Sequence, residues 1–299
     1  MGRGKSQHSL DLVQAAQGIL AEIQPCSVRA VCYRLFSMGM IASMKKGETD
    51  KVSRLLTRAR EDGIIPWSHV VDETRRRECP SMWKDAGDYI DTCKKSFRRD
   101  HWLLQPLHVE VWSEKSTVKG SIAPVLDAFG VPFRPVHGYT SATAVHDAAA
   151  ECAGANKPWV ILYIGDHDPS GMHMSMVDLP RRLEKYGAQN FELLRLALTR
   201  DDVEAGNLLS FPLASKRKDP RHRWYKETTR SYATGLCWEL DALSPVVLRN
   251  RLEAAIRAEI DHAQWERSSA AGAAEDASLT TYFAGWKRYF KASRLEKVF

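Results

Sequence analysis

The feature that most constrains the fold is an alternation of short apolar runs with helical segments between residues 104 and 265. The apolar, strand-like runs occupy 108–112, 132–136, 159–164 and 191–198, and helical segments at 121–129, 140–152 and 176–187 separate them. Strands that alternate with helices are typical of βαβ units, which build a mostly parallel sheet. We therefore predict an α/β domain with a mostly parallel sheet over 104–265.

The N-terminal quarter of the chain has a different pattern. Apolar residues at helical spacing predict helices at 9–23, 28–39 and 51–63, with a turn or wing at 44–50 and a short extended piece at 64–75. Pro25 separates the first two helices, and Ser27 stands in the N-cap position of the second. Three short helices with a hairpin-like element favour a winged-helix-like DNA-binding domain over 1–77.

Two further segments, 78–103 and 266–299, lie outside these two domains. Residues 78–103 form a charged connector, for which we predict a helix. Residues 266–299 form a linker and a C-terminal tail, with the small-residue stretch 268–278 as the linker. The sequence therefore predicts an α-helical domain and an α/β domain that are joined by a connector.

Positive charge is gathered in clusters along the chain. Lys and Arg outnumber Asp and Glu by 43 to 37. Clusters of basic residues can follow the backbone of a polyanion, although solvated helix faces often have the same composition. We expect contacts with double-stranded DNA from Arg54, Arg58, Lys216, Arg217, Lys218, Arg221 and Arg223.

Cysteine usage and hydropathy indicate the compartment. The six cysteines form no CxxC pair, which favours reduced thiols. The longest apolar runs are too short to span a bilayer, and the N-terminus lacks the apolar segment of a secretory signal. We therefore expect a cytoplasmic protein with no membrane association, located at the nucleoid if the source is bacterial or a phage.

Three acidic residues follow two of the predicted strands. Glu114 follows 108–112, and Asp166 and Asp168 follow 159–164. Loops at the carboxyl ends of parallel strands converge at one edge of the sheet, so we expect the three carboxylates to meet there if the strands are neighbours. Like charges so close need a cation, and oxygen ligands suit Mg²⁺ or Mn²⁺. The alternative is that Asp168, which precedes Pro and Ser, only caps a helix or forms a turn.

Two further groups near these acids have two possible interpretations. Glu239 and Asp241 occupy a similar strand-like context and could join the site, but helix capping explains them too. His167 and His173 flank the acidic turn and suggest zinc, although no partner His or Cys stands at ligand spacing.

Tyr33 lies away from the apolar stripe of its predicted helix. At 100° per residue it stands about 140° from Val28, on the side of Arg29 one turn earlier. A phenol beside a guanidinium can meet a phosphate as a nucleophile. The alternative is a partly exposed tyrosine that covers the next domain or touches the DNA backbone.

These motifs together resemble a known family. Glu114 in VWSEK and the Asp pair in IGDHDPSG, 52 residues after it, resemble a Toprim domain, a Rossmann-like fold that binds Mg²⁺. The motif VRAVCY, with Arg29 four positions before Tyr33, resembles the catalytic helix of the topoisomerase VI A subunit and its meiotic double-strand-break relative. The resemblance covers roughly residues 10–260 and is closest to the short bacterial and phage-borne proteins called mini-A.

The resemblance implies a DNA-cleaving mechanism of the type IIB topoisomerases. Tyr33 would attack a DNA phosphodiester and form a 5′-phosphotyrosyl link, and Arg29 would steady the phosphate. Glu114, Asp166 and Asp168 would hold Mg²⁺. A homodimer would build each site from two protomers and cut both strands.

Two departures from the family leave alternatives open. Cys32 stands where many relatives have the first of two tyrosines. The sequence also has no Gly-rich ATPase segment, so strand passage would need a separate B-type subunit. The alternatives are a Toprim nuclease that uses metal-activated water, with Tyr33 structural, and a DNA-binding module without catalysis.

Overall fold

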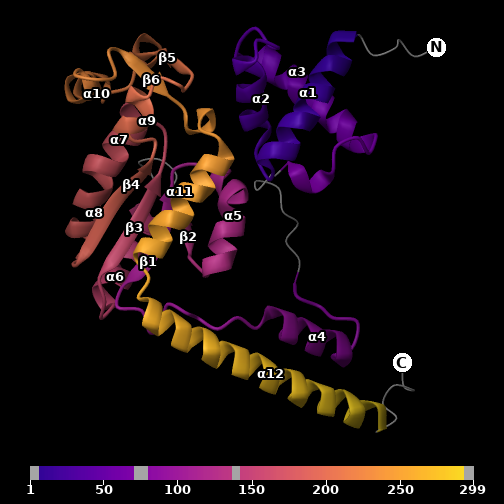
Figure 1. Ribbon diagram of the computed structural model, residues 1–299. Helices are drawn as coiled ribbons and strands as arrows, with labels where there is room; N and C mark the ends of the chain where they lie inside the picture. The colour runs from indigo at the N-terminus through magenta and orange to yellow at the C-terminus, as the bar shows by residue number, and fades with distance from the viewer. Residues whose placement is uncertain (1–6, 71–79, 137–141, 293–299) are drawn as a thin grey trace. The chain divides into compact units, whose positions relative to one another are not determined.

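The computed structural model of the protein describes residues 7–70, 80–136 and 142–292 (Figure 1). The chain forms two compact units. The larger contains Met1–Arg75 and Leu107–Glu259, and the smaller contains Arg76–Pro106 and Ile260–Phe299. The predicted connector and the predicted tail thus belong to one unit, although they are far apart in the sequence.

The larger unit is built on a four-stranded parallel sheet. Its strands are β1 (His108–Ser113), β2 (Phe133–Pro135), β3 (Trp159–Ile164) and β4 (Phe191–Ala197). Their order is β2-β1-β3-β4, and every pair is parallel. The prediction of a mixed α/β fold with a parallel sheet is confirmed.

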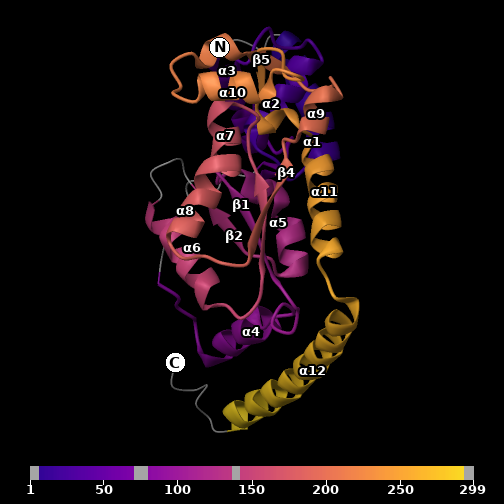
Figure 2. The same ribbon diagram turned by 90° about the vertical axis from the view of Figure 1, so that its left-hand side faces the viewer.

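Helices cover both faces of this sheet. α5 (Val118–Phe129) and α11 (Pro245–Ala258) pack together on one face, while α6 (Ala142–Gly154) and α8 (Leu179–Lys185) pack on the other (Figures 1 and 2). All six residues of β3 are buried. A strand covered on both faces is a continuous apolar run, which explains the sequence WVILYI.

A small second sheet lies beyond the carboxyl end of β3. It pairs β5 (Ser210–Pro212) with β6 (Leu236–Trp238) in antiparallel fashion. Two helices, α9 (Arg200–Glu204) and α10 (His222–Thr229), belong to the same stretch of chain. A bridge between His167 and Trp238, with backbone hydrogen bonds of 2.9 and 3.0 Å, joins β6 to the turn that follows β3.

The N-terminal part contains α1 (Gln7–Ile23), α2 (Val28–Ser37) and α3 (Lys46–Glu61) around one apolar core. Ser27 caps α2, because its Oγ accepts a hydrogen bond from the Ala30 amide at 3.2 Å. Gly39 and Gly63 follow α2 and α3 with φ of 70° and 73°, a conformation that glycine adopts without steric cost. The three helices and the Ser27 cap match the prediction.

The predicted turn or wing at 44–50 is wrong from Lys46 onward. α3 already begins there, since Lys and Glu are good helix formers. Between 7 and 70 the described chain has no hairpin, and the predicted extended piece contains the 3-10 turn Trp67–His69 and one bridge from Val70 to Cys26. The remainder of that piece, 71–75, lies outside the described residues.

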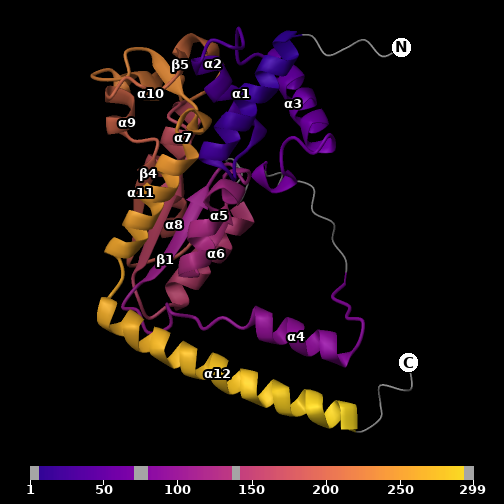
Figure 3. The same ribbon diagram turned by 45° about the vertical axis from the view of Figure 1, so that its right-hand side comes forward.

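The smaller unit contains α4 (Ala86–Ser96) and the long α12 (His262–Ala292), which lie alongside each other (Figure 3). α4 lies within the predicted helical connector. The predicted linker 268–278 is wrong, because it lies inside α12. Its many alanines favour a helix as strongly as they favour a small-residue linker. Within the described residues, no helix is both long and apolar enough to cross a bilayer.

Candidate functional site

The three predicted acids follow two neighbouring strands. Glu114 follows β1, and Asp166 and Asp168 follow β3, with Ser113 and Ile164 paired in register. Burial raises the pKa of the Glu114 carboxyl, and the negative charges of Asp166 and Asp168 raise it further. The three acids therefore follow neighbouring strands at one edge of the sheet, as predicted.

Asp168 is also the N-cap of α7 (Pro169–His173). Its Oδ1 accepts a hydrogen bond from the Gly171 amide at 2.8 Å. Its Oδ2 lies 2.9 Å from Nζ of Lys216, and its side chain is 5% exposed. The capping interpretation of Asp168 is thus correct, and it leaves one carboxylate oxygen for a cation.

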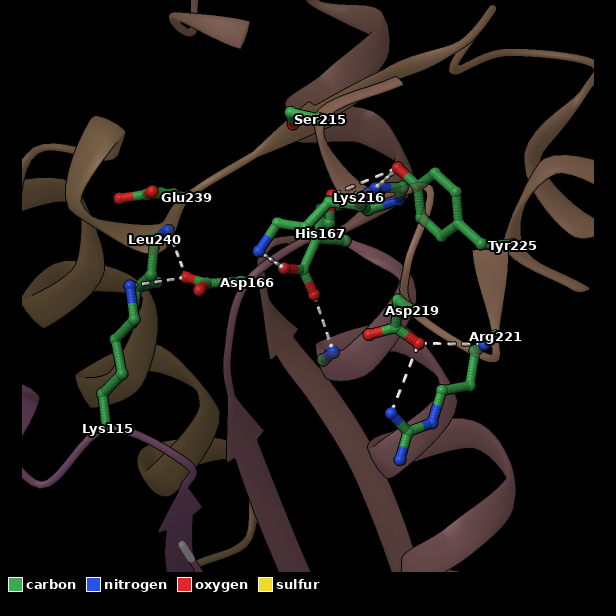
Figure 4. A network of polar contacts seen from close by, with 12 residues as sticks. Lys115, Asp166, His167, Ser215, Lys216, Asp219, Arg221, Tyr225, Glu239 and Leu240 are labelled. Atoms are coloured by element: carbon green, nitrogen blue, oxygen red, sulfur yellow. Dashed lines mark hydrogen bonds and ion pairs between the residues drawn. The ribbon is translucent and has the colours of Figure 1, made fainter. Parts of the chain in front are cut away.

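Asp166 has two partners from outside its own strand (Figure 4). Its Oδ1 accepts a hydrogen bond from the Leu240 amide at 2.7 Å and lies 2.8 Å from Nζ of Lys115. Burial raises the pKa of the Asp166 carboxyl, against the opposing effect of the Lys115 ammonium. The acidic turn is therefore tied to β1 and to the segment after β6.

Glu239 and Asp241 join this cluster. They flank Leu240 in the short turn Leu240–Ala242 that follows β6. Asp241 lies 3.2 Å from Nζ of Lys115 and 3.5 Å from Nε of Arg29. Glu239 accepts hydrogen bonds from Nε of Arg29, at 2.8 Å, and from its Nη2. The carboxylate side chain of Glu239 does not cap the turn, so the capping interpretation is wrong for this residue.

Tyr33 is more buried than its position on the helical wheel indicates. α2 buries Val31, Cys32 and Leu35 in the N-terminal core, but Ala30 and Tyr33 are also buried, on the side that contacts the Leu240–Ala242 turn. Tyr33 is 7% exposed. A helix between two layers has two buried faces, and a single apolar stripe cannot reveal the second.

The environment of the Tyr33 hydroxyl is acidic and basic at once. The Arg29 guanidinium, which binds Glu239, lies 5.7 Å from the ring centre. Burial raises the pKa of the Tyr33 phenol, and the Glu239 charge raises it further against the opposing effect of Arg29. The predicted neighbourhood of Arg29 and Tyr33 is confirmed, but the guanidinium is bound to acids in this state.

A cleft of about 440 Å³ lies beside some of these groups. It is lined by Ser27, Arg29, Lys115, Thr117, Asp166, Glu239 and Asp241. The start of α2, the end of β1, the acidic turn and the segment after β6 therefore surround one space. Four parts of the chain that are distant in the sequence contribute to it.

The acids are partly balanced by basic side chains. Five carboxylates, at Glu114, Asp166, Asp168, Glu239 and Asp241, accompany three basic groups, at Arg29, Lys115 and Lys216. The Arg195 guanidinium, which binds the backbone of the same turn, adds a fourth positive charge, so one negative charge remains when all of these groups are ionised. The oxygen donors suit Mg²⁺ chemically. Across the described residues, however, no three His, Cys, Asp or Glu side chains are placed to hold a metal ion together.

Sequence reasoning missed Arg195, which holds the acidic turn in shape. From β4 its guanidinium donates hydrogen bonds to the Gly165 carbonyl at 3.0 Å and to the Asp166 carbonyl. It also donates to the carbonyls of Gly171, at 3.0 Å, and Leu198, at 2.7 Å. An arginine inside a strand pattern looks like an exposed position, so the sequence contains no signal for this role.

Gly171 allows its own backbone to lie close to the backbone of Asp166. A Cβ atom there would lie 2.4 Å from the backbone oxygen of Asp166. This distance is shorter than any non-bonded contact, so only glycine fits. Gly165 is also confined, since a Cβ atom would lie 2.7 Å from the Tyr163 ring. The close neighbour is therefore backbone at Gly171 and a side chain at Gly165.

His167 is a buried part of the turn. Its two ring nitrogens lie 2.8 Å from the Tyr225 hydroxyl and 3.3 Å from the Tyr232 hydroxyl. The ring also makes an edge contact with Trp238. Burial lowers the pKa of His167 to about 4, and Arg195 contributes. These contacts favour a neutral imidazole that packs β6 against the turn.

The predicted DNA-contacting residues fall into two groups. Arg54 and Arg58 are exposed one turn apart on α3, and Arg217 and Lys218 are exposed near α10. The other three have acidic partners: Lys216 binds Asp168, Arg221 binds Asp219, and Arg223 binds Glu227. Lys216 thus belongs to the acidic cluster, and DNA contact by the whole set stays a prediction.

The chain matches no protein-family model, and no curated protein matches it.

Proposed function

We propose that this protein is a metal-dependent DNA-cleaving transesterase of the topoisomerase VI A type, with a winged-helix-like N-terminal part and a Toprim domain. The observation that carries the proposal is the common cleft. Arg29, one turn from Tyr33 on α2, lines it together with Asp166 from the end of β3, while Tyr33 itself lines a neighbouring pocket that shares Asp241 with the cleft. A nucleophile, a phosphate-binding cation and acidic residues are the components that phosphoryl transfer requires.

Each group would have a distinct role. Tyr33 would attack a DNA phosphodiester to give a 5′-phosphotyrosyl link. Arg29, on release from Glu239, would bind a phosphate oxygen. Mg²⁺ or Mn²⁺ held by Glu114, Asp166 and Asp168 would neutralise charge on the transferring phosphate. For this, Lys115 and Lys216 must leave Asp166 and Asp168.

DNA would approach over the exposed basic residues. Arg54 and Arg58 point outward from α3, and Arg217 and Lys218 extend the positive surface of the larger unit. Neutralising phosphates with Lys and Arg releases counterions, so binding would weaken steeply with salt. Because the cleft lies within one protomer, each protomer would carry its own site, in place of the site shared between two protomers that the resemblance implies. Cutting of both strands would use a homodimer in the cytoplasm or nucleoid, and strand passage would use a separate ATPase subunit.

A Toprim nuclease is the second candidate, and one observation favours it. Tyr33 is buried, and burial and the Glu239 charge raise the pKa of its phenol, as expected for a structural tyrosine. In that case a water molecule activated by metal would attack the phosphate, and cut ends would be free of protein.

Labelled supercoiled DNA distinguishes these candidates. The protein is incubated with it in Mg²⁺ or Mn²⁺ and denatured, and label attached to protein is measured. We expect a covalent adduct that Tyr33→Phe abolishes and that Tyr282→Phe, at a 67% exposed tyrosine of α12, preserves. Free cut ends that survive Tyr33→Phe and vanish with Asp166→Ala would establish the nuclease. Salt-sensitive binding without cutting would leave a DNA-binding module.

A further inference from the structure

Glu239 lies beside the proposed nucleophile of the transesterase. It follows β6, and its side chain reaches α2 instead of capping the turn that it precedes. There it binds Arg29, whose guanidinium lies 5.7 Å from the centre of the Tyr33 ring, and its charge raises the pKa of the Tyr33 phenol. A tyrosine needs a proton acceptor to become a nucleophile, since its unperturbed pKa is near 10.

We propose that Glu239 is the general base that accepts the Tyr33 proton during DNA cleavage, an inference that rests on the proposed function. The Oη–H bond of Tyr33 breaks and its proton passes to a carboxylate oxygen of Glu239. Oη then forms its bond to phosphorus, and the bond from phosphorus to the 3′ oxygen breaks. That oxygen leaves with the electron pair and takes a proton from solvent. In religation the protonated Glu239 returns the proton to Oη.

The groups around Glu239 keep it ionised for this role. Burial raises the pKa of its carboxyl, but the hydrogen bonds from Arg29 and the charge of Lys115 outweigh burial, so the pKa is lowered. Asp241 adds a negative charge on the next turn and is itself bound to Lys115. The acceptor is therefore a carboxylate at neutral pH, as general-base catalysis requires.

Arg29 contacts both the proposed nucleophile, Tyr33, and the proposed base, Glu239. Its guanidinium lies over the Tyr33 ring and binds the same Glu239 oxygen with two nitrogens. When DNA arrives, a phosphate can replace Glu239 as a partner of Arg29. Glu239 then loses a partner that lowers its pKa and becomes a stronger base. Binding of the substrate would in this way activate the acceptor.

The rate of adduct formation in single-turnover experiments tests this role. Wild type, Glu239→Gln and Glu239→Asp are compared between pH 6 and 9, with Glu192→Gln, an exposed acid of β4, as the control. We expect Glu239→Gln to slow the reaction by about 100-fold or more, with a rate that rises about tenfold per pH unit because solvent must take the proton. Glu239→Asp should restore part of the rate, and the control should equal wild type.

The result that overturns the role of Glu239 alone is an adduct in Glu239→Gln at the wild-type rate and pH profile. An absence of adduct from wild type would instead overturn the transesterase function, and this role with it.

A second measurement tests the effect of Glu239 on Tyr33 without relying on cleavage. The pKa of the Tyr33 phenol can be followed by NMR of ¹³Cζ-labelled tyrosine, with its signal identified by its loss in Tyr33→Phe. We expect the pKa to fall in Glu239→Gln, because the carboxylate charge raises it in wild type. An unchanged pKa would show that the carboxylate does not act on the hydroxyl.

Discussion

Nζ of Lys115 lies 2.8 Å from Oδ1 of Asp166, across the carboxyl ends of two adjacent parallel strands. The same ammonium is 3.2 Å from Asp241. Burial lowers the pKa of Lys115, but the carboxylates outweigh burial and raise it, so the lysine is charged at neutral pH. The Lys115 ammonium thus binds Asp166, one of the three acids for which the sequence predicts a metal ion.

Lys115→Met should therefore change both stability and metal binding. Without metal we expect a loss of about 1–3 kcal/mol in the free energy of unfolding, since two partly buried carboxylates lose a charged partner. With the competing ammonium gone, Mg²⁺ should raise the melting temperature more than in wild type. Thermal unfolding with and without Mg²⁺ measures both effects, with the exposed Lys119→Met as the control. Equal Mg²⁺ responses in the two variants would contradict competition at Asp166.

Gly171→Ala should distort the acidic turn. The new methyl group would lie 2.4 Å from the Asp166 backbone oxygen, and backbone cannot move aside as a flexible side chain can. We expect a loss of about 1–3 kcal/mol or more in the free energy of unfolding, measured by urea titration. Gly18→Ala in α1 is the control, because nothing lies within 4 Å of its Cβ position and alanine favours a helix. Similar stabilities of the two variants would contradict the close approach.

Arg195→Met should also destabilise the acidic turn, because Arg195 binds the turn from β4. It removes the donors to the carbonyls of Gly165, Gly171 and Leu198. The Gly165 carbonyl keeps a hydrogen bond from the Leu198 amide, at 2.7 Å, and the Gly171 carbonyl keeps one from the Ser175 hydroxyl, at 3.2 Å. The loss therefore falls mainly on the carbonyls of Asp166 and Leu198. A buried acceptor left without a donor costs about 1–3 kcal/mol, so the total loss should exceed that of most surface changes. Arg200→Met, with a side chain that is 59% exposed, should change the free energy of unfolding by less than about 0.5 kcal/mol. A stable Arg195→Met variant would show that the turn holds its shape without the arginine.

Glu110 should make stability depend on acid pH. It is buried in β1 and receives two hydrogen bonds from Arg134, at 3.0 and 3.1 Å. Burial raises the pKa of its carboxyl, but hydrogen bonds from His108, Arg134 and Trp112 outweigh burial and lower the pKa from 4.5 to about 2.

Because the folded-state pKa is below the unfolded one, this stabilisation is present above pH 4.5 and is lost as the pH falls towards 2. The full loss would be about 3 kcal/mol. In Glu110→Gln the free energy of unfolding should be lower at pH 7 and should fall less steeply between pH 4.5 and 2. Chemical unfolding at pH 7 and between pH 4.5 and 2 measures these free energies, with Glu192→Gln as the control. Equal slopes in both variants would rule out this role for Glu110.

The strands could be predicted because a central parallel strand is apolar on both faces, as WVILYI is. The acids at their ends followed from the geometry of parallel sheets. The depth of Tyr33 could not be predicted, because its burial comes from the turn at Leu240–Ala242, more than 200 residues later. Arg195 and Lys115 were missed for a similar reason, since their partners are backbone carbonyls and carboxylates that only the folded chain brings close.

The nature of the protein–DNA bond tests the central proposal most directly. The protein is allowed to react with DNA in Mg²⁺, the DNA is digested with nucleases, and the peptides are examined by mass spectrometry. The account predicts a nucleotide joined through its 5′ phosphate to the peptide that contains Tyr33. Cleaved DNA with free 5′ phosphates and an unmodified Tyr33 peptide would contradict it.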